Sequence, residues 1–159
     1  SGGIGSIAVQ YAVSKGARVI GIASAGNADY LRSIGAIPIS YHESIKEKIQ
    51  ELSGVTVTKM LDCYGGDYVK LGFQLGLRGD QIATLVPSPS AILKGAQFTG
   101  PRHSQYDDFL SLAELVSKGE ISVRLDKIYP FSLSEIKEAY KDLEKGHTRG
   151  KRVIVIQEE

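Results

Sequence analysis

The stretch Ser1-Gly2-Gly3-Ile4-Gly5-Ser6-Ile7-Ala8-Val9-Gln10 decides the fold of this chain. Its glycines allow the backbone to turn tightly and to approach a ligand closely. Apolar side chains then recur at the spacing of one helix face: Ile4, Ile7, Ala8, Tyr11 and Ala12. The N–H groups and the positive dipole end of such a helix would point into the turn. Taken alone, the stretch predicts either a phosphate-binding turn or a plain tight turn.

The segment that follows completes most of a mononucleotide-binding unit. Lys15 and Gly16 are typical of a helix end, and residues 18–23 are typical of a buried strand. A turn, a helix and a strand in this order fit the start of a dinucleotide-binding fold, which also requires a strand before the glycines. We expect that first strand to be missing from this chain.

The missing strand would lie in the middle of the sheet. In the strand order 3-2-1-4-5-6, its neighbours are the strands predicted at residues 18–23 and 57–63. Both neighbours would then expose unpaired backbone groups. We expect the gap to be filled by upstream residues, by direct pairing of the two neighbours, or by a strand from another copy of the chain.

Strands and helices alternate along the rest of the chain. Strands are predicted at residues 18–23, 37–41, 57–63, 81–86, 95–99, 125–129 and 153–156. Helices are predicted at residues 3–14, 28–34, 43–52, 68–77, 105–118 and 133–144, the last with Ser132 as its N-cap. Residues 87–90 are predicted to be a loop. This alternation predicts an α/β fold, a Rossmann-like and mostly parallel sheet with helices on both faces.

The composition is that of an ordinary globular domain. The chain has 159 residues and a net charge of +1, so nothing indicates binding to nucleic acid or to an anionic membrane. No apolar run approaches the ~20 residues of a membrane span. The single cysteine, Cys63, excludes an internal disulfide and favours a reducing, cytoplasmic location. The scattered His42, His103 and His147 suit no metal site.

A series of short motifs runs along almost the whole chain. They are Gly2-Gly3-Ile4-Gly5 with Ala8-Val9-Gln10, Gly16-Ala17-Arg18-Val19-Ile20, Leu31-Arg32-Ser33-Ile34-Gly35-Ala36, Ile39-Ser40-Tyr41, Leu61-Asp62-Cys63-Tyr64-Gly65-Gly66, Phe131-Ser132-Leu133, Ala139-Tyr140 and Gly146-His147-Thr148-Arg149-Gly150-Lys151. In this order the motifs resemble the coenzyme-binding domain of medium-chain dehydrogenases/reductases, in the branch of zinc-independent quinone oxidoreductases and enone reductases. The resemblance implies that residues 1–159 form a dinucleotide-binding domain and that a separate N-terminal catalytic domain is missing. It also implies that residues from about 120 to 159 pack back toward that missing domain.

The resemblance implies a binding site for NADPH. Gly2, Gly3, Ile4 and Gly5 would meet the cofactor pyrophosphate, the first three through their backbone N–H groups. A turn that serves only packing remains the alternative for this segment.

Three further residues bear on the choice of coenzyme. Ser24 stands where an acidic residue would bind the ribose 2′-hydroxyl of NAD, and serine does not repel a 2′-phosphate. Asn27 stands where several relatives place a lysine for that phosphate, so the expected charge is absent at this position. Tyr41 matches a family tyrosine that lies over the 2′-phosphate and the adenosine. We therefore expect NADPH; the alternative is ordinary helix capping by Ser24 and Asn27, and an exposed strand end at Tyr41.

The nicotinamide half would lie at the ends of two other strands. By resemblance, Cys63, Tyr64 and Val86 border it, at the carboxyl ends where open parallel sheets bind ligands. Cys63 has no basic neighbour in sequence and is expected to be a buried structural thiol. Asp62 and Asp67 are interpreted as capping or solvated residues. No catalytic residue is predicted, because those groups are expected on the missing domain.

The implied function is hydride transfer from NADPH to a quinone or an α,β-unsaturated carbonyl compound. The cofactor performs this chemistry and the protein positions it. A nucleotide-binding module without catalysis and a fragment of a zinc-dependent alcohol dehydrogenase remain alternatives, because these residues are compatible with both. The chain alone is expected to be inactive. Its expected partners are a small-molecule substrate and, in a homodimer, a second copy, with neither nucleic acid nor a membrane.

Overall fold

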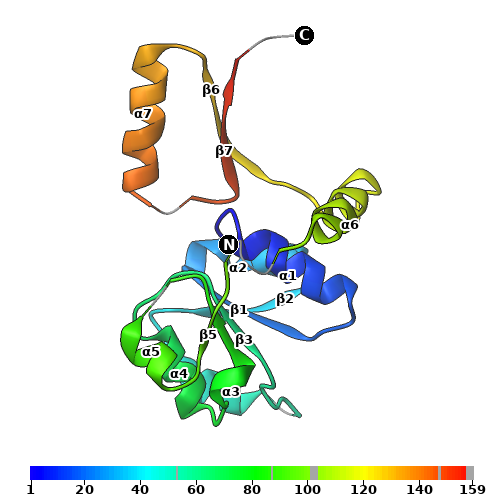
Figure 1. Cartoon of the computed structure of the whole chain (residues 1–159), viewed down its shortest axis with the longest axis vertical. Coiled ribbons are helices and arrows are strands. Elements are labelled where there is room, and N and C mark those ends of the chain that lie inside the picture. Colours follow the sequence, from blue (N-terminus) through cyan, green and yellow to red (C-terminus); the bar gives the residue numbers. More distant parts are fainter. Residues whose placement is uncertain (53, 87, 101–103, 147, 157–159) are drawn as a thin grey trace. The chain divides into compact units, whose positions relative to one another are not determined.

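The computed structural model describes residues 1–52, 54–86, 88–100, 104–146 and 148–156. The chain forms two compact units, one of residues Ser1–Tyr41 and Ala113–Glu159, the other of residues His42–Leu112 (Figure 1). All strand pairs within the sheets are parallel, as the alternation of strands and helices predicted. Pro87, His103 and His147, which the sequence analysis considered, lie outside the described residues.

The first unit opens with the predicted turn, helix and strand. Its elements are α1 (Gly5–Ser14), β1 (Val19–Ala23), the short 3₁₀ helix η1 (Ala25–Asn27), α2 (Ala28–Ser33) and β2 (Ala36–Ser40). Glycines with positive φ follow both α-helices, Gly16 at 82° and Gly35 at 87°, and end them as predicted. β1 and β2 pair in parallel, and the buried core between the elements consists of Ala23, Leu31 and Ala36.

The C-terminal part of the first unit is a β-α-β segment. It consists of β6 (Leu125–Pro130), α7 (Leu133–Glu144) and β7 (Lys151–Val155). β6 and β7 pair in parallel, and α7 lies alongside them (Figure 1). Ser132 begins α7 as predicted, because its hydroxyl accepts the backbone N–H of Glu135 at 3.2 Å.

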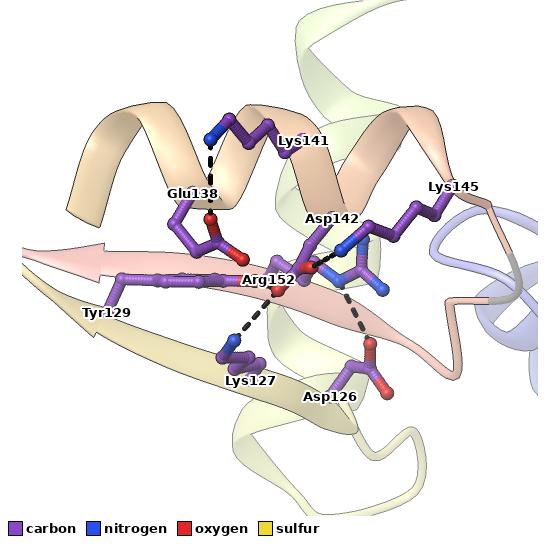
Figure 2. Close-up of polar contacts among 8 residues, drawn as sticks. All are labelled: Asp126, Lys127, Tyr129, Glu138, Lys141, Asp142, Lys145 and Arg152. Carbon is purple, nitrogen blue, oxygen red and sulfur yellow. Dashed lines mark hydrogen bonds and ion pairs between the residues drawn. The ribbon is translucent and has the colours of Figure 1, made fainter. Parts of the chain in front are cut away.

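A polar network joins α7 to β6 (Figure 2). The carboxylate of Asp142 accepts hydrogen bonds from Nζ of Lys127 at 2.7 Å, Nζ of Lys145 at 3.0 Å and the hydroxyl of Tyr129 at 2.9 Å. Tyr129 is fully buried, so its hydroxyl needs such a partner. The hydrogen bonds from Lys127, Lys145 and Tyr129 hold the pKa of Asp142 well below its usual range. The network therefore fixes the helix on the sheet.

The second unit contains a three-stranded parallel sheet in the order β3-β4-β5. Its elements are α3 (Ile45–Glu51), β3 (Met60–Asp62), α4 (Tyr68–Gln74), the 3₁₀ helix η2 (Gly79–Gln81), β4 (Ile82–Thr84), α5 (Pro89–Leu93) and β5 (Gln97–Phe98). α6 (Tyr106–Ser117) follows and crosses the boundary between the units. One local prediction is wrong: residues 89–90 begin α5 and do not form a loop, because proline is compatible with the first position of a helix.

The observed pairing matches the predicted strand order on both sides of the expected gap. β1 pairs with β2, and β4 pairs with both β3 and β5. In the described residues, β1 and β2 form one sheet in the first unit, and β3, β4 and β5 form another in the second unit. No helix in the same residues is both long and apolar enough to cross a bilayer.

Candidate functional site

The glycine turn leads into α1 without a side-chain cap. The N–H of Ser6 donates to the carbonyl of Gly2 at 3.0 Å, and Gly5 is the first helical residue. Ile4 occupies the N-cap position, where its apolar side chain cannot accept a hydrogen bond, and it is 56% exposed. The first turn of α1 contains no acidic residue. These side chains therefore leave the positive end of the helix dipole uncompensated, which suits an anionic ligand.

Residues 149–151 lie directly against this turn, a contact that the sequence analysis missed. Gly2 forms an isolated parallel bridge with Gly150. A Cβ atom on Gly3 would lie 3.0 Å from the carbonyl oxygen of Gly150 and 3.0 Å from Cδ of Lys151. The turn thus has no room for a side chain at Gly3, and the aliphatic stem of Lys151 packs there. The signal that could have found this contact is the pair of basic residues around a glycine in the sequence Arg149-Gly150-Lys151.

Arg149 reaches the loop that follows β1. A Cβ atom on Gly26 would lie 3.1 Å from Nη2 of Arg149, so the guanidinium lies against the backbone of this loop. Ser24 directly follows β1 in an extended conformation and begins the same loop. The structure therefore places a cation beside the loop in which Asn27 stands instead of a lysine.

Asn27 is buried, with 6% of its surface exposed. Its Nδ2 donates to Oγ of Ser1 at 2.9 Å, which joins the loop to the glycine turn. In the described part of the chain, no donor reaches its buried Oδ1. Ser24 and Asn27 occupy the N-cap positions of η1 and α2, as the capping alternative expected, but neither makes a side-chain capping bond. A buried acceptor without a donor is unfavourable, and the site therefore fits a ligand that brings a hydroxyl or N–H group.

Tyr41 lies at the edge of the sheet where β1 and β2 end. Its backbone N–H donates to the carbonyl of Ala23 at 3.0 Å, and the residue is 38% exposed. The first unit thus carries most of the residues predicted to bind the cofactor: Gly2, Gly3, Ile4, Gly5, Ser24, Asn27 and Tyr41.

Residues 149–151, of which Lys151 begins β7, are held beside the segment that precedes β6. Oε1 of the buried Gln10 accepts hydrogen bonds from the backbone N–H of Ser122 at 2.8 Å and from the hydroxyl of Ser122 at 3.1 Å. Nε2 of Gln10 donates to the carbonyl of Ser122 at 3.0 Å. The N–H of Lys151 donates to the carbonyl of Arg124 at 2.8 Å. Gly150 has a φ of 100°, and a Cβ atom there would overlap the backbone of Arg124. α1 and the segment before β6 are therefore held together with residues 149–151.

In the second unit, a buried polar pair lies at the ends of β3 and β4. Oδ1 of Asp62 accepts the N–H of Tyr64 at 2.9 Å and that of Gly65 at 2.8 Å. Its Oδ2 accepts the hydroxyl of Thr84 at 2.8 Å. Asp62 is 3% exposed and Thr84 is 0% exposed. Asp62 is therefore buried and holds the turn after β3, whereas Asp67 is exposed and occupies the N-cap position of α4.

The three residues predicted to border the nicotinamide are exposed beside this pair. Tyr64 is 82% exposed, Val86 is 39% exposed, and Cys63 is also exposed. The prediction of a buried thiol is wrong, because Asp62 takes the inward position and successive residues of an extended chain point to opposite faces. Desolvation and the neighbouring carboxylate of Asp62 raise the pKa of the Cys63 thiol, so it remains protonated at neutral pH.

The chemistry of the groups in the first unit suits a ligand that carries phosphates and hydroxyls. The uncapped start of α1, together with Arg149 and Lys151, suits phosphate, while Oδ1 of Asn27 suits a hydroxyl. The exposed Tyr64 and Val86 offer apolar contact in the second unit. Within the residues that the structure describes, no three His, Cys, Asp or Glu side chains gather as a metal-binding group would require.

Comparison with known proteins identifies the family of this chain. Residues 42–154 match the family described as zinc-binding dehydrogenase. The chain is 28% identical to the mitochondrial NAD(P)H oxidoreductase RTN4IP1 of Bos taurus, over 97% of the chain and 46% of that protein. It is 30% identical to the NAD-dependent alcohol dehydrogenase of Sulfolobus acidocaldarius, over 98% of the chain and 48% of that protein.

A solved structure gives the same result for the fold. The quinone oxidoreductase from Coxiella burnetii superimposes with a TM-score of 0.82 at 29% identity, over 98% of this chain and 50% of that one. The chain spans about half the length of the relatives that it matches. Its Rossmann-like strands and helices and the family match over most of its length agree, and the chain therefore belongs to the zinc-binding dehydrogenase family of the medium-chain dehydrogenase/reductase superfamily.

Proposed function

We propose that this chain is the NADPH-binding part of an oxidoreductase that transfers a hydride from NADPH to a quinone or an α,β-unsaturated carbonyl compound. Family membership supports hydride chemistry with a nicotinamide cofactor, and relatives named as NAD(P)H and quinone oxidoreductases support the substrate class. The observation that carries the choice of NADPH is the guanidinium of Arg149 against Gly26.

The adenosine half of the cofactor would bind to the loop after β1. Ser24 places no carboxylate there to repel a 2′-phosphate, and Arg149 supplies a cation beside the same loop. A guanidinium forms charge-assisted and often bidentate hydrogen bonds with phosphate. The Oδ1 of Asn27 would accept a hydroxyl of the ribose, and Tyr41 would lie over the adenosine.

The pyrophosphate would bind at the glycine turn. The backbone of Gly2, Gly3 and Ile4 would approach it closely, because Gly3 and Gly5 carry no side chain and α1 begins without a cap. The ammonium of Lys151, whose stem packs against Gly3, would add a positive charge to the same turn.

The nicotinamide half would contact Cys63, Tyr64 and Val86. When bound, the cofactor supplies the hydride. The contribution of these residues would be to orient the nicotinamide and to exclude water from it, since the thiol of Cys63 is protonated and two of the side chains are apolar or aromatic.

A substitution of Arg149 tests the coenzyme assignment. We expect the unmodified protein to bind NADPH more tightly than NADH, and Arg149→Gln to weaken NADPH binding by about 10- to 100-fold, because a hydrogen bond to a charged group contributes about 1.5–3 kcal/mol. NADH binding should remain unchanged, since NADH lacks the 2′-phosphate. Isothermal titration calorimetry with both coenzymes measures these affinities.

The matched control is Arg32→Gln, which removes an exposed arginine of the same unit that pairs with Asp29. This variant should bind both coenzymes like the unmodified protein. Equal affinity of the unmodified protein for NADPH and NADH would contradict the assignment. Oxidation of NADPH with a panel of quinones and enones tests the substrate class.

An NAD-dependent alcohol dehydrogenase is the second candidate. It is favoured by the family description and by the relative from Sulfolobus acidocaldarius, which is named for that activity. This candidate requires preference for NADH in the coenzyme titration and oxidation of alcohols in the substrate panel. A zinc determination on the purified protein separates its zinc-dependent form from the first proposal.

A further inference from the structure

Asp62 and Thr84 form a polar pair where the core of a parallel sheet is usually apolar. They are register partners and are the last residues of β3 and β4. A buried carboxylate is unfavourable unless close donors replace its lost hydration. The two N–H groups and one hydroxyl that meet Asp62 provide this replacement. A fully paired network of this kind holds its surroundings in a single arrangement.

The hydrogen bonds of the pair extend into the two turns beyond the strands. Asp62 holds the turn after β3 through the N–H groups of Tyr64 and Gly65. Oγ of Thr84 accepts the N–H of Val86 at 3.1 Å and lies 3.0 Å from its carbonyl oxygen. One continuous set of buried polar atoms therefore connects the two turns.

The turns also pack against each other directly. Gly65 has a φ of 94°, and a Cβ atom there would lie 2.8 Å from Cγ1 of Val86. The absence of a side chain at Gly65 thus lets the Val86 side chain close over the turn. The exposed surface of this strand edge, formed by Cys63, Tyr64 and Val86, is set by the buried atoms beneath it.

We propose that Asp62 and Thr84 are positioning residues for the nicotinamide half of the cofactor. Both are buried, so they act through Tyr64, Gly65 and Val86 and do not touch the cofactor. The pair holds the nicotinamide-facing surface in its binding arrangement before the cofactor arrives, which spares the entropy of ordering it on binding. This inference rests on the proposed function.

The test compares Thr84→Val with Thr84→Ser. Valine has the shape of threonine but leaves Oδ2 of Asp62 without its hydroxyl donor and the N–H of Val86 without its acceptor, whereas serine keeps the hydroxyl. The affinity for NADPH depends on both halves of the proposed site, and the fluorescence of bound NADPH reports on the surroundings of its nicotinamide. Adenosine 2′,5′-bisphosphate reports on the adenosine half alone. We expect Thr84→Val to lower the affinity for NADPH by at least about 10-fold and to change the affinity for the bisphosphate by no more than about twofold. Thr84→Ser should keep both the affinity for NADPH and the fluorescence of bound NADPH at the values of the unmodified protein.

The matched control is Thr99→Val, because the hydroxyl of Thr99 meets the carbonyl of Thr84 at 3.3 Å and is not part of the pair. It should bind both probes normally. Asp62→Ala gives a second reading with the same expectation if Thr84→Val does not fold. Normal NADPH binding by a folded Thr84→Val variant, or equal weakening of both probes, would overturn the inference alone. Failure of the unmodified protein to bind either probe would overturn the proposed function as well.

Discussion

At the residue scale, the glycine turn depends on the absence of one side chain. The position of Gly3 faces the carbonyl oxygen of Gly150 and the stem of Lys151 at 3.0 Å each. A side chain there would press on residues 149–151. The close approach of these residues to the turn therefore depends on Gly3.

Gly3→Val is therefore expected to lower the affinity for NADPH by more than 100-fold while most of the fold persists, because a branched side chain would crowd the turn at which the pyrophosphate is proposed to bind. Fluorescence titration with NADPH measures the affinity, and circular dichroism checks the fold. Gly100→Val is the control, since a Cβ atom there would lie 3.8 Å from the ring of Phe98, an ordinary contact distance. Near-normal affinity of Gly3→Val would mean that phosphate does not bind at this turn.

Single residues also mark the limit of what the sequence predicts. Local pattern predicted the glycine turn and the helix start, because these follow from neighbouring residues. It did not predict that Asp62 points inward and Cys63 outward, since the strand is short and both of its faces mix apolar and polar residues. Arg149 was missed because its contact with Gly26 joins residues far apart in the sequence.

At the scale of elements, α7 is attached to β6 by charge as well as by packing. Asp142 is the centre of this attachment, and the helix surface around it is largely exposed. Its hydrogen bonds to Lys127, Lys145 and Tyr129 lower its pKa in the folded chain relative to the unfolded chain. The β-α-β segment should consequently be sensitive to acid.

The sign of this effect follows from the lowered pKa. The stabilising contribution of Asp142 is fully present above the ordinary Asp pKa of about 4 and is lost as the pH falls toward the lower value of the folded state. We expect Asp142→Asn to be less stable than the unmodified protein at neutral pH, and this difference to shrink below a pH of about 4. Thermal unfolding across this pH range measures it.

Asp107→Asn, which changes an exposed residue at the start of α6, is the control and should leave the unfolding temperature nearly unchanged at neutral pH. A constant difference between Asp142→Asn and the unmodified protein at every pH would show that the ionised carboxylate contributes nothing to stability.

The observed ends of helices agree with the prediction where a glycine follows the helix or a capping residue precedes it. Gly16, Gly35 and Ser132 lie at the predicted helix ends. Strand lengths followed less well: the strand predicted at residues 57–63 is confined to Met60–Asp62, because pairing with a short neighbour limits it. Hydrophobic pattern indicates which residues favour a strand but does not indicate how far the partner extends.

At the scale of the whole chain, the N-terminal helix and the C-terminal segment of the first unit depend on Gln10. The oxygen and the nitrogen of its side-chain amide both form hydrogen bonds with the backbone of Ser122. The nitrogen also donates to the carbonyl of Ser6 at 3.0 Å. Gln10→Met keeps the volume but removes these bonds. We expect a loss of about 1–3 kcal/mol in the free energy of unfolding, because the N–H and carbonyl of Ser122 lose their partners.

The same variant should also weaken NADPH binding more than NADH binding, because the loop that carries Arg149 is held by this segment. Chemical denaturation and coenzyme titration measure the two effects. Gln97→Met is the control, since this exposed glutamine donates only to the nearby carbonyl of Gly95 among the bonds of the described residues. Unchanged stability of Gln10→Met would contradict the role of Gln10.

The pairing of strands within each unit was predictable, whereas the division of the chain into two units was not. Parallel pairing of β1 with β2, and of β4 with β3 and β5, follows from right-handed crossovers between alternating strands and helices. The return of residues 113–156 to the unit of residues 1–41 depends on long-range contacts such as Gln10 with Ser122 and Gly2 with Gly150. No local pattern carries that information.

The arrangement of Arg149, Gly150 and Lys151 has a consequence for how coenzyme preference could evolve or be engineered. Gly150 cannot be exchanged, because its backbone conformation and its contact with Arg124 admit no side chain. Arg149 lies against the neighbouring loop with the far end of its exposed side chain, so natural variation at this position can proceed without rebuilding the scaffold. A designer who wants an NADH-preferring variant would therefore begin with a library at position 149 and keep the glycine constant.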